Sequence, residues 1–268
     1  MCLILLAHQA HPSYRLVLAA NRDEHFDRPT AAAAFWREAP EVLAGRDLRA
    51  GGTWLGITRT GRLAAVTNYR DPSSWLDDAP SRGELVSGFL LGKAHPESYA
   101  RRLEEQADEY NGFNLILSDG EELYWYSNRA GGIRALEPGI YGLSNHLLDT
   151  PWPKVTGGKA ALRRLLAQSG IPSSEDLLTL LSDRSRPDDA GLPDTGVGPE
   201  WERLLSPLFV ASPDYGTRSS TILTVDDRER VHFLERTFDA NPDHATTASF
   251  EFRIGSQETG PREPMSSR

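Results

Sequence analysis

Hydrophobic residues occur in short runs separated by polar turns, a pattern that predicts strands joined as hairpins. The first run, CLILLAHQ, is followed by the turn HPSY and a second apolar run, so residues 2–21 are expected to form a β-hairpin. The same order of run, Gly-containing turn and run recurs at about residues 53–68. Further strands are predicted at residues 113–119, 122–128, 133–136, 140–143, 219–227, 229–238 and 249–254.

A longer periodicity predicts helices between these groups of strands. Apolar residues at i, i+4, i+8 and i+11 favour a helix over residues 97–110. The peptide SRGE at residues 81–84 has the spacing of a capping box, which predicts a helix that continues through Leu91. Two more helices are expected over residues 154–168, with Gly170 at the C′ position, and over residues 174–182.

Groups of hairpins alternate with pairs of helices, and this order favours an antiparallel α+β fold. Two sheets stacked between two helical layers would account for the number of elements. No linker divides the chain into halves with separate cores, so residues 1–254 are expected to form one domain. The tail, residues 255–268, is polar and is expected to be disordered.

Composition narrows the class of protein. The chain has 268 residues and a formal net charge of −9, with its basic residues scattered among acids. This distribution argues against nucleic acid as a partner. No stretch approaches the length of a membrane span, and a single cysteine fits a reducing, cytoplasmic environment. Nothing in the sequence indicates the number of subunits.

The one cysteine, Cys2, directly follows the initiator Met1. Removal of Met1 would leave a chain that begins with a thiol and a free α-amine on the same residue. The amine could then accept the thiol proton, which makes such a residue its own nucleophile and base. The alternative is that Cys2 is a small apolar residue at the start of a buried strand.

A polar cluster, Asn21-Arg22-Asp23-Glu24, follows the second apolar run of the first hairpin. Antiparallel pairing brings the end of one strand beside the start of its partner, so position 2 should lie opposite positions 20–23. There, a carboxylate could hold the α-amine, and a guanidinium would favour the thiolate by lowering the thiol pKa. The cluster could equally be an ordinary charged turn.

An acyl-transfer site also needs donors for the oxyanion of a tetrahedral intermediate. Asn68 and Asn145 end apolar runs and are candidates, whereas Asn114 could instead be a turn residue. Arg218, just before the run SSTILTV, is a possible second cation. The seven histidines have no cysteine cluster or metal-ligand spacing beside them, so no metal site is expected.

Several segments, in this order, resemble the NRDE-motif family, also called the transport and Golgi organisation family. They are MCLILL, AANRDE, GGTWLGIT, VTNYRDP, GFNLIL, GLSNHLLDTPWPKV and RSSTILTVD, and they extend from residue 1 to about residue 240. That family is more distantly similar to the choloylglycine hydrolase and penicillin V acylase group of N-terminal nucleophile hydrolases. The resemblance implies their αββα four-layer sandwich with two antiparallel sheets.

The resemblance also implies a set of site residues. An N-terminal cysteine is the nucleophile in that group, and the matching positions here are Cys2, Arg22, Asp23, Asn68, Asn145 and Arg218. One departure is the direct adjacency of Arg22 and Asp23. Neighbouring side chains on a strand point to opposite faces, so both would face Cys2 only if the strand ends or bulges there.

The resulting prediction is a cysteine hydrolase that acts on a linear amide, without a cofactor. Its ligand would be a small acyl amide or another hydrophobic molecule, and Trp54, Trp75, Trp125 and Tyr69 could line an acyl pocket. The alternative is an intracellular carrier for haem or acyl lipids on a hydrolase-like fold. In that case haem would be the ligand, and Cys2 or a histidine such as His146 would contact it.

Overall fold

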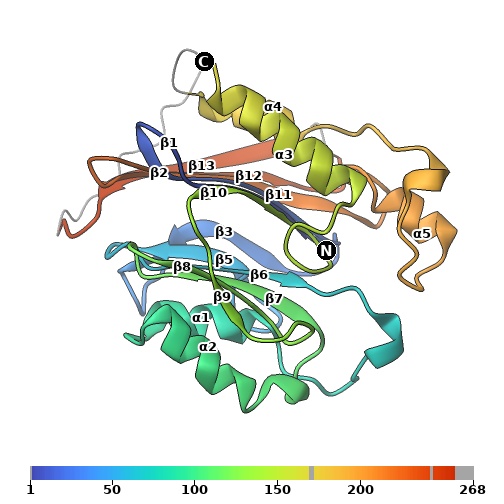
Figure 1. The fold of residues 1–268 in the computed structure, drawn as a ribbon, viewed down its shortest axis with the longest axis horizontal. Coiled ribbons are helices and arrows are strands. Elements are labelled where there is room, and N and C mark those ends of the chain that lie inside the picture. Colours follow the sequence, from blue (N-terminus) through green and yellow to red (C-terminus); the bar gives the residue numbers. More distant parts are fainter. Residues whose placement is uncertain (1, 169–171, 242–243, 257–268) are drawn as a thin grey trace.

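The computed structural model describes residues 2–168, 172–241 and 244–256. Two antiparallel sheets stack face to face, and a pair of helices covers the outer face of each (Figure 1). The predicted αββα four-layer sandwich is therefore confirmed. Gly170 and nearly all of the predicted tail lie outside the described residues.

The first sheet has six strands in the order β10-β1-β2-β11-β12-β13. It contains the N-terminal hairpin and the two hairpin strands near the C-terminus. Its strands are β1 (Cys2–His11), β2 (Tyr14–His25), β10 (Gly139–Leu143), β11 (Tyr215–Asp226), β12 (Arg230–Phe238) and β13 (Ala245–Arg253).

The second sheet has seven strands in sequence order, β3 to β9. Its strands are β3 (Thr30–Phe35), β4 (Val42–Asp47), β5 (Leu55–Thr58), β6 (Leu63–Asn68), β7 (Phe113–Ser118), β8 (Leu123–Ser127) and β9 (Ile133–Ala135). The sequence pattern did not predict β3 or β4. The run TAAAAF of β3 is rich in alanine, which is depleted in strands, and its place at the edge of a larger sheet decides its conformation.

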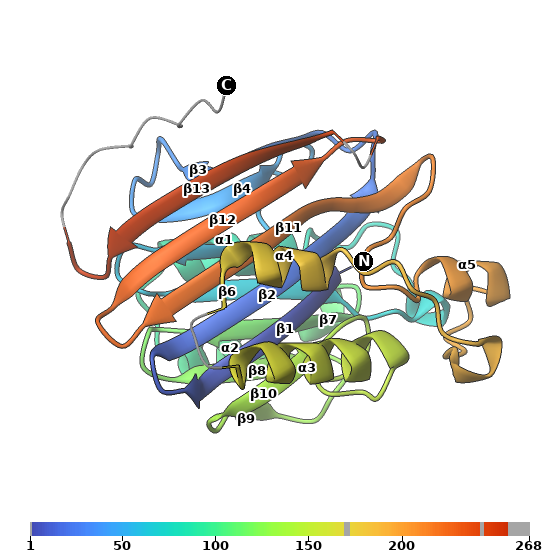
Figure 2. The same ribbon diagram turned by 90° about the horizontal axis from the view of Figure 1, so that it is seen from above.

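Helices α3 (Pro153–Leu166) and α4 (Ser174–Leu181) pack on the outer face of the six-stranded sheet, where Figure 2 shows α3 over β1 and β10 and α4 over β2 and β11. Helices α1 (Gly83–Leu91) and α2 (Pro96–Glu104) cover the seven-stranded sheet. Short helical segments complete the chain. They are η1 (Pro72–Ser74), η2 (Ala107–Glu109), η3 (Asp189–Gly191) and α5 (Pro199–Leu204).

The predicted helices are present, with two corrections. Helix α1 has Arg82 as its N-cap, which makes no side-chain cap hydrogen bond, and Ser81 Oγ accepts from the Gly83 backbone N–H at 3.3 Å instead of closing the predicted capping box with Glu84. The predicted helix over residues 97–110 ends at Glu104 and resumes as the separate turn η2. A capping box does form elsewhere, between Ser173 and Asp176 at the start of α4.

Three apolar layers hold the sandwich together. Even-numbered residues of β1, such as Ile4 and Leu6, belong to the core between the sheets. Odd-numbered residues, such as Leu3 and Leu5, belong to the core beneath α3 and α4. This alternation decides which face each polar residue of the first hairpin meets.

Candidate active site

A cavity of about 410 Å³ opens between the two sheets at the end where β1 begins. The six-stranded sheet contributes Cys2, Arg22, Arg218 and Glu235 to its lining. The opposite sheet and its loops contribute Trp54, Asn68, Trp75 and Arg82, among others. Residues far apart in the sequence therefore meet at one cavity that is lined by charged and aromatic side chains, while the rest of the interface between the sheets is packed with apolar side chains.

Cys2 lies on the wall of this cavity, and its residue is only 8% exposed. It pairs in register with Arg22, as the hairpin prediction required. Ser144 Oγ donates to the Cys2 carbonyl at 3.0 Å and ties β10 to this strand end. Burial raises the pKa of the Cys2 thiol, and the Asp23 carboxylate raises it further, whereas the Arg22 guanidinium and a hydrogen bond from the Asp23 backbone N–H lower it.

Strand β2 continues to His25, so the whole Asn21–Glu24 cluster lies within a strand rather than after one. Arg22 shares the face of Cys2 and points between the sheets. Asn21 and Asp23 occupy the opposite face of the strand, although Asp23 also reaches the edge of the cavity. The side chains of Arg22 and Asp23 therefore approach Cys2 from two different sides.

The contacts of Asn21 and Asp23 follow from this alternation. Asn21 Nδ2 donates to the carbonyls of Leu181 and Leu208, at 2.9 and 2.8 Å, so this amide joins the sheet to the helical side. Asp23 Oδ1 accepts a hydrogen bond from Thr217 Oγ1 at 2.7 Å. Burial raises the pKa of Asp23, and the Lys154 ammonium offsets part of that rise.

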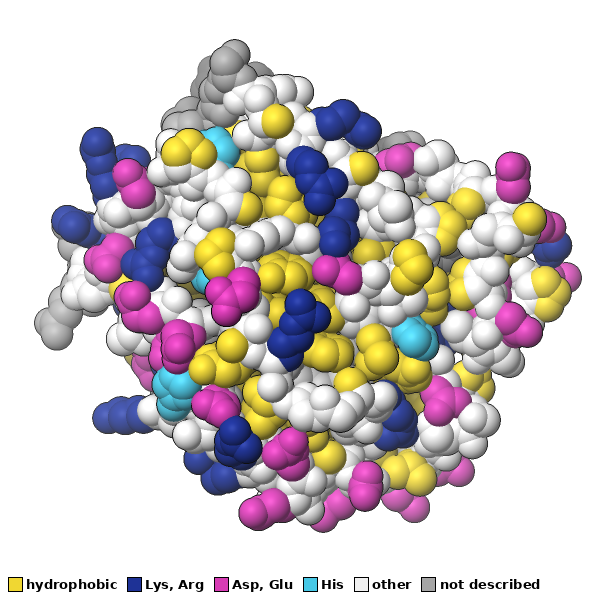
Figure 3. All heavy atoms as spheres, viewed as in Figure 1, with side chains coloured by type: hydrophobic (Ala, Val, Ile, Leu, Met, Phe, Trp, Pro, Cys, Tyr) yellow, Lys and Arg dark blue, Asp and Glu magenta, His cyan; other side chains and the backbone are white. Residues whose placement is uncertain are grey.

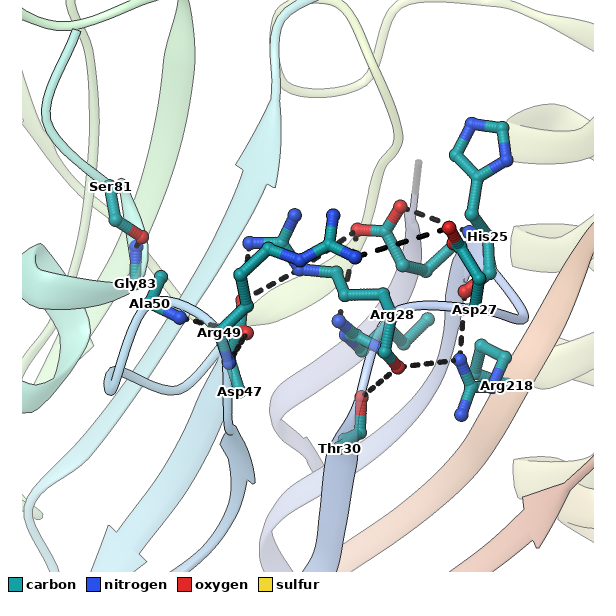
Figure 4. Close-up of polar contacts among 12 residues, drawn as sticks. His25, Asp27, Arg28, Thr30, Asp47, Arg49, Ala50, Ser81, Gly83 and Arg218 are labelled. Carbon is teal, nitrogen blue, oxygen red and sulfur yellow. Dashed lines mark hydrogen bonds and ion pairs between the residues drawn. The ribbon is translucent and has the colours of Figure 1, made fainter. Parts of the chain in front are cut away.

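A β-bulge places Arg218 at the cavity. In the pairing of β11 with β2, Thr217 lies opposite Asp23 and Ser219 lies opposite Arg22, so Arg218 is the extra residue between them. The bulge lets Arg218 and Ser219 both line the cavity while Thr217 turns to Asp23. Arg218 Nη1 donates to the carbonyls of His25 and Arg28, at 2.8 and 3.0 Å, as Figure 4 shows.

The three asparagines predicted as candidates have different environments. Asn68 lines the cavity. Asn145 is fully buried, and its Nδ2 donates to the Asn68 carbonyl at 3.0 Å, so it positions Asn68 from behind. Asn114 is also fully buried, and its Nδ2 donates to the His146 carbonyl at 3.0 Å. Thus Cys2, Arg22, Arg218 and Asn68 meet at the cavity wall, with Asp23 at its edge and Asn145 behind it.

The sequence did not reveal the buried charges behind Asp23. Arg70 and Glu202 form an ion pair of 2.5 Å, and their side chains are 3% and 4% exposed. Lys154 is also buried and donates to the Leu205 carbonyl at 2.9 Å. Burial lowers the pKa of Lys154 to about 8, although the Asp23 carboxylate opposes that change. Because Arg70 and Glu202 are 132 positions apart and Lys154 lies in a third segment, only the folded chain brings them together.

Two further cavity residues were also missed. Glu235 is 4% exposed, and its Oε1 accepts from the Ala33 backbone N–H at 2.6 Å, which joins the two sheets. Arg82, the N-cap of α1, faces Cys2 from the opposite wall. The position of Glu235 in an alternating strand would have predicted an inward side chain, because Val231 and Phe233 point the same way.

Of the four aromatic residues proposed for an acyl pocket, Trp54 and Trp75 line the cavity. Tyr69 instead stacks on His146, and its hydroxyl lies 2.8 Å from His146 Nε2. The other ring nitrogen of His146 lies 2.9 Å from Thr150 Oγ1. A haem iron at His146 would have to displace one of these hydrogen bonds, and a haem ligand stays a prediction.

Two features are absent from the described residues. No helix in that part of the chain is both long and apolar enough to cross a bilayer. Within the same residues, no three His, Cys, Asp or Glu side chains are grouped so that they could hold a metal ion. On the face seen in Figure 3, acidic, basic and hydrophobic side chains are interspersed.

Two solved structures are similar to this one at low sequence identity. A mutant of the conjugated bile acid hydrolase from Clostridium perfringens is 8% identical with a TM-score of 0.49, over 98% of this chain and 100% of that one. An N-acylethanolamine-hydrolyzing acid amidase ortholog from Caenorhabditis elegans is 10% identical with a TM-score of 0.40, over 83% and 92% of the two chains. At scores this low, the likeness carries no inference about chemistry.

Sequence relatives give a much closer match. The chain is 38% identical to the Transport and Golgi organization 2 homolog of Mus musculus, over 96% of this chain and all of the relative. It is 31% identical to Transport and Golgi organization protein 2 of Drosophila melanogaster, over 88% and 92% of the two chains. A family model described as Transport and Golgi organisation 2 matches residues 1–240, and the chain belongs to that family.

Proposed function

We propose that this protein is a cysteine amidohydrolase of the N-terminal nucleophile type, with Cys2 as its nucleophile and a linear acyl amide as its substrate. One observation carries the proposal. The only cysteine of the chain starts a strand at the wall of a cavity, in register with Arg22. A cation beside a thiol favours the thiolate, which is the reactive form.

The reaction starts once Met1 has been removed. The α-amine of Cys2 accepts the thiol proton, and the sulphur attacks the acyl carbon of the amide. Asp23 holds the protonated amine, while Asn68 and the Asp23 backbone N–H donate hydrogen bonds near the sulphur and the oxyanion. The carbon–nitrogen bond then breaks, and the leaving amine takes the proton from the α-amine.

The second half of the reaction frees the enzyme. Water attacks the thioester carbon and gives one proton to the α-amine, and the carbon–sulphur bond breaks. The products are the carboxylic acid and the Cys2 thiol, so atoms and charges balance over the two steps. Arg22 contributes in both halves because a thiolate is consumed in the first and released in the second.

Mass spectrometry of the purified protein provides the first test. Loss of Met1 is expected, and full retention of Met1 in active protein would rule out the α-amine as the base. Incubation with a panel of fluorogenic acyl amides should add one acyl group to the protein. Because Cys2 is the only cysteine, a thioester adduct can be assigned without mapping.

Substitution provides the second test. Cys2→Ala should reduce kcat/KM by at least about a thousandfold, because it removes the nucleophile. The matched control is Ser206→Ala, which removes a small polar side chain outside the cavity. Equal activity of Cys2→Ala and the unmodified protein would place the chemistry elsewhere.

A further inference from the structure

The cavity wall opposite Cys2 has a cation that the proposed mechanism does not use. Arg82 lies at the start of α1 and belongs to the cavity lining. Its Nη1 donates to the Gly112 carbonyl at 3.0 Å, and no carboxylate in the described part of the chain lies within ion-pair distance of it. Burial lowers the pKa of Arg82 to about 10, although the negative charge of ionised Cys2 opposes that change.

The other cations of the cavity are compensated to different degrees. Arg28 forms an ion pair of 2.6 Å with Asp47, as Figure 4 shows. Arg22 forms a long ion pair with Glu24, since its Nη2 lies 3.8 Å from Glu24 Oε2, and its charge also acts on the buried Glu235 carboxylate. Arg218 is hydrogen-bonded to backbone carbonyls rather than to an acid. Positive charge is therefore only partly neutralised around Cys2.

Two buried donors also favour a negatively charged ligand in the cavity. Arg22 Nη1 and Arg218 Nε have no hydrogen-bond partner among the described residues, and the Arg22 side chain is 9% exposed. Burial lowers the pKa of Arg218, and the nearby Arg22 guanidinium lowers it further. Unpartnered donors and facing guanidinium groups are both costly, and an anion between them would relieve both costs.

The remaining lining is apolar on one side. Trp54, Val66, Trp75 and Pro80 belong to the wall around Arg82, and the Arg82 guanidinium lies 5.9 Å from the Trp75 ring centre. A ligand that matches the cavity would thus combine an apolar part with a compact charged group. The aromatic wall would contact the apolar part, and the guanidinium groups would bind the charge.

We infer that the acyl amides bound at this site carry a compact anionic group, such as a carboxylate, and that Arg82 holds that group opposite Cys2. The inference rests on the proposed function for the amide bond alone. The anion preference belongs to the cavity itself and can be measured without any hydrolysis. Arg82 is therefore a specificity-determining residue that neither the sequence pattern nor the family resemblance indicated.

Two alkylating reagents of nearly equal size test the inference. Iodoacetate is an anion, iodoacetamide is neutral, and both react with the Cys2 thiolate. The rate with iodoacetate is divided by the rate with iodoacetamide. Because both reactions need the thiolate, this ratio does not depend on the ionisation of the thiol and reports only the preference for negative charge. In the unmodified protein, this ratio should exceed that of N-acetylcysteine amide by about tenfold, as one charge-assisted contact would give.

Variants of Arg82 show whether this residue causes the preference for the anionic reagent. Arg82→Gln should bring the ratio close to that of the free thiol, whereas Arg82→Lys should keep most of the preference. Arg236→Gln is the charge-matched control, because Arg236 pairs with Glu175 and lies outside the cavity lining. Its ratio should stay unchanged. If Arg82→Gln and Arg82→Lys both fold and both keep the ratio of the unmodified protein, the inference would be overturned.

A substrate pair separates this inference from the proposed function. An acyl amide that ends in a carboxylate is compared with its methyl ester. Arg82→Gln should lower kcat/KM for the carboxylate by about tenfold and change the ester by less than about twofold. An anion preference in alkylation without hydrolysis of either substrate would refute the amidohydrolase alone. Hydrolysis of both substrates without dependence on Arg82 would refute the anion site alone.

Discussion

Asn21 and Arg22 are neighbours on β2, both are buried, and their side chains have opposite surroundings. The Asn21 amide donates two hydrogen bonds on the helical side, and its Oδ1 accepts a third from Ser220 Oγ at 2.6 Å. Arg22 faces the cavity, where its Nη1 has no partner among the described residues. One residue satisfies its polar groups within the fold, and the other leaves a donor for a ligand.

The difference divides the tetrapeptide NRDE into two kinds of residue. On the helical side, Asn21 and Asp23 are joined to the end of α4, to the loop at Leu208 and to β11. On the cavity side, Arg22 and Glu24 meet each other only at 3.8 Å. Sites for ligands are often built at the expense of stability, so the two faces should respond differently to substitution. Three predictions test that difference.

The largest effect is expected at Asn21. Asn21→Ala would leave the carbonyls of Leu181 and Leu208 and the hydroxyl of Ser220 buried without their present partner. Each unsatisfied group costs about 1–3 kcal/mol, so the free energy of unfolding should fall by about 3 kcal/mol or more. Urea unfolding at constant m-value measures this loss.

Arg22→Met is the matched control, because it keeps the length of the side chain and removes the guanidinium. The lost ion pair with Glu24 is long, so stability should change by less than about 1 kcal/mol. The proposed amidase activity should nevertheless fall sharply. Equal losses of stability in Asn21→Ala and Arg22→Met would refute the division of the two faces.

The sequence predicted the part of the site that depends on local order. The hairpin fixed Cys2 opposite Arg22, because apolar alternation and a short turn set the register of neighbouring strands. Asn68 ends β6 as expected and lines the cavity, whereas Arg218, expected just before a strand, lies within β11. The bulge at Arg218 was not predictable, since it exists only in the pairing of β11 with β2, strands nearly 200 residues apart.

The parts that were missed depend on contacts between distant layers. Arg82 was seen only as part of a helix start, yet the stacking of the two sheets sets it opposite Cys2. Lys154 and Glu202 are charged residues, and the hydrophobic periodicity of their segments would place such side chains at the surface. Their burial follows from how α3 and α5 pack beside the first sheet, which hydrophobic periodicity does not encode.

A smaller effect is expected at the buried ion pair of Arg70 and Glu202, behind Asp23. Glu202→Gln keeps acceptors for Thr195 but removes the charge that pairs with Arg70 at 2.5 Å. An unpaired buried guanidinium is costly, so the free energy of unfolding should fall by about 3 kcal/mol, the lower end of the cost of breaking a buried ion pair. Chemical denaturation of the purified variant provides the measurement.

Glu24→Gln gives the comparison from the cavity side. Glu24 is a partly exposed carboxylate whose two arginine partners are both 3.8 Å away, so its loss should cost less than about 1 kcal/mol. If Glu24→Gln destabilised the protein more than Glu202→Gln, the ion pairs of Glu24 at the cavity would contribute more to stability than the buried pair of Arg70 and Glu202. The contrast between the two faces of β2 would then be reversed.

The smallest effect is a change of slope with pH, at Glu235 on the cavity side. Burial raises the pKa of Glu235, and hydrogen bonds from Ala33 and Ser219 and the Arg22 charge offset only part of that rise. A raised pKa in the folded state means that the fold prefers the protonated acid. That contribution to stability is complete below the ordinary glutamate pKa and is lost as the pH rises through the folded-state value.

Glu235→Gln cannot lose this contribution, because its amide does not ionise. The free energy of unfolding of Glu235→Gln, relative to the unmodified protein, should therefore increase between pH 4 and pH 7. Ser219→Ala should steepen the fall in the protein that keeps Glu235, since the Ser219 hydrogen bond lowers that pKa. A difference that stays flat with pH would mean that the Glu235 carboxylate is as well solvated in the cavity as in water. The cavity side of the six-stranded sheet would then hold the Glu235 charge without a cost in stability, and the contrast with Asn21 would be limited to hydrogen bonding.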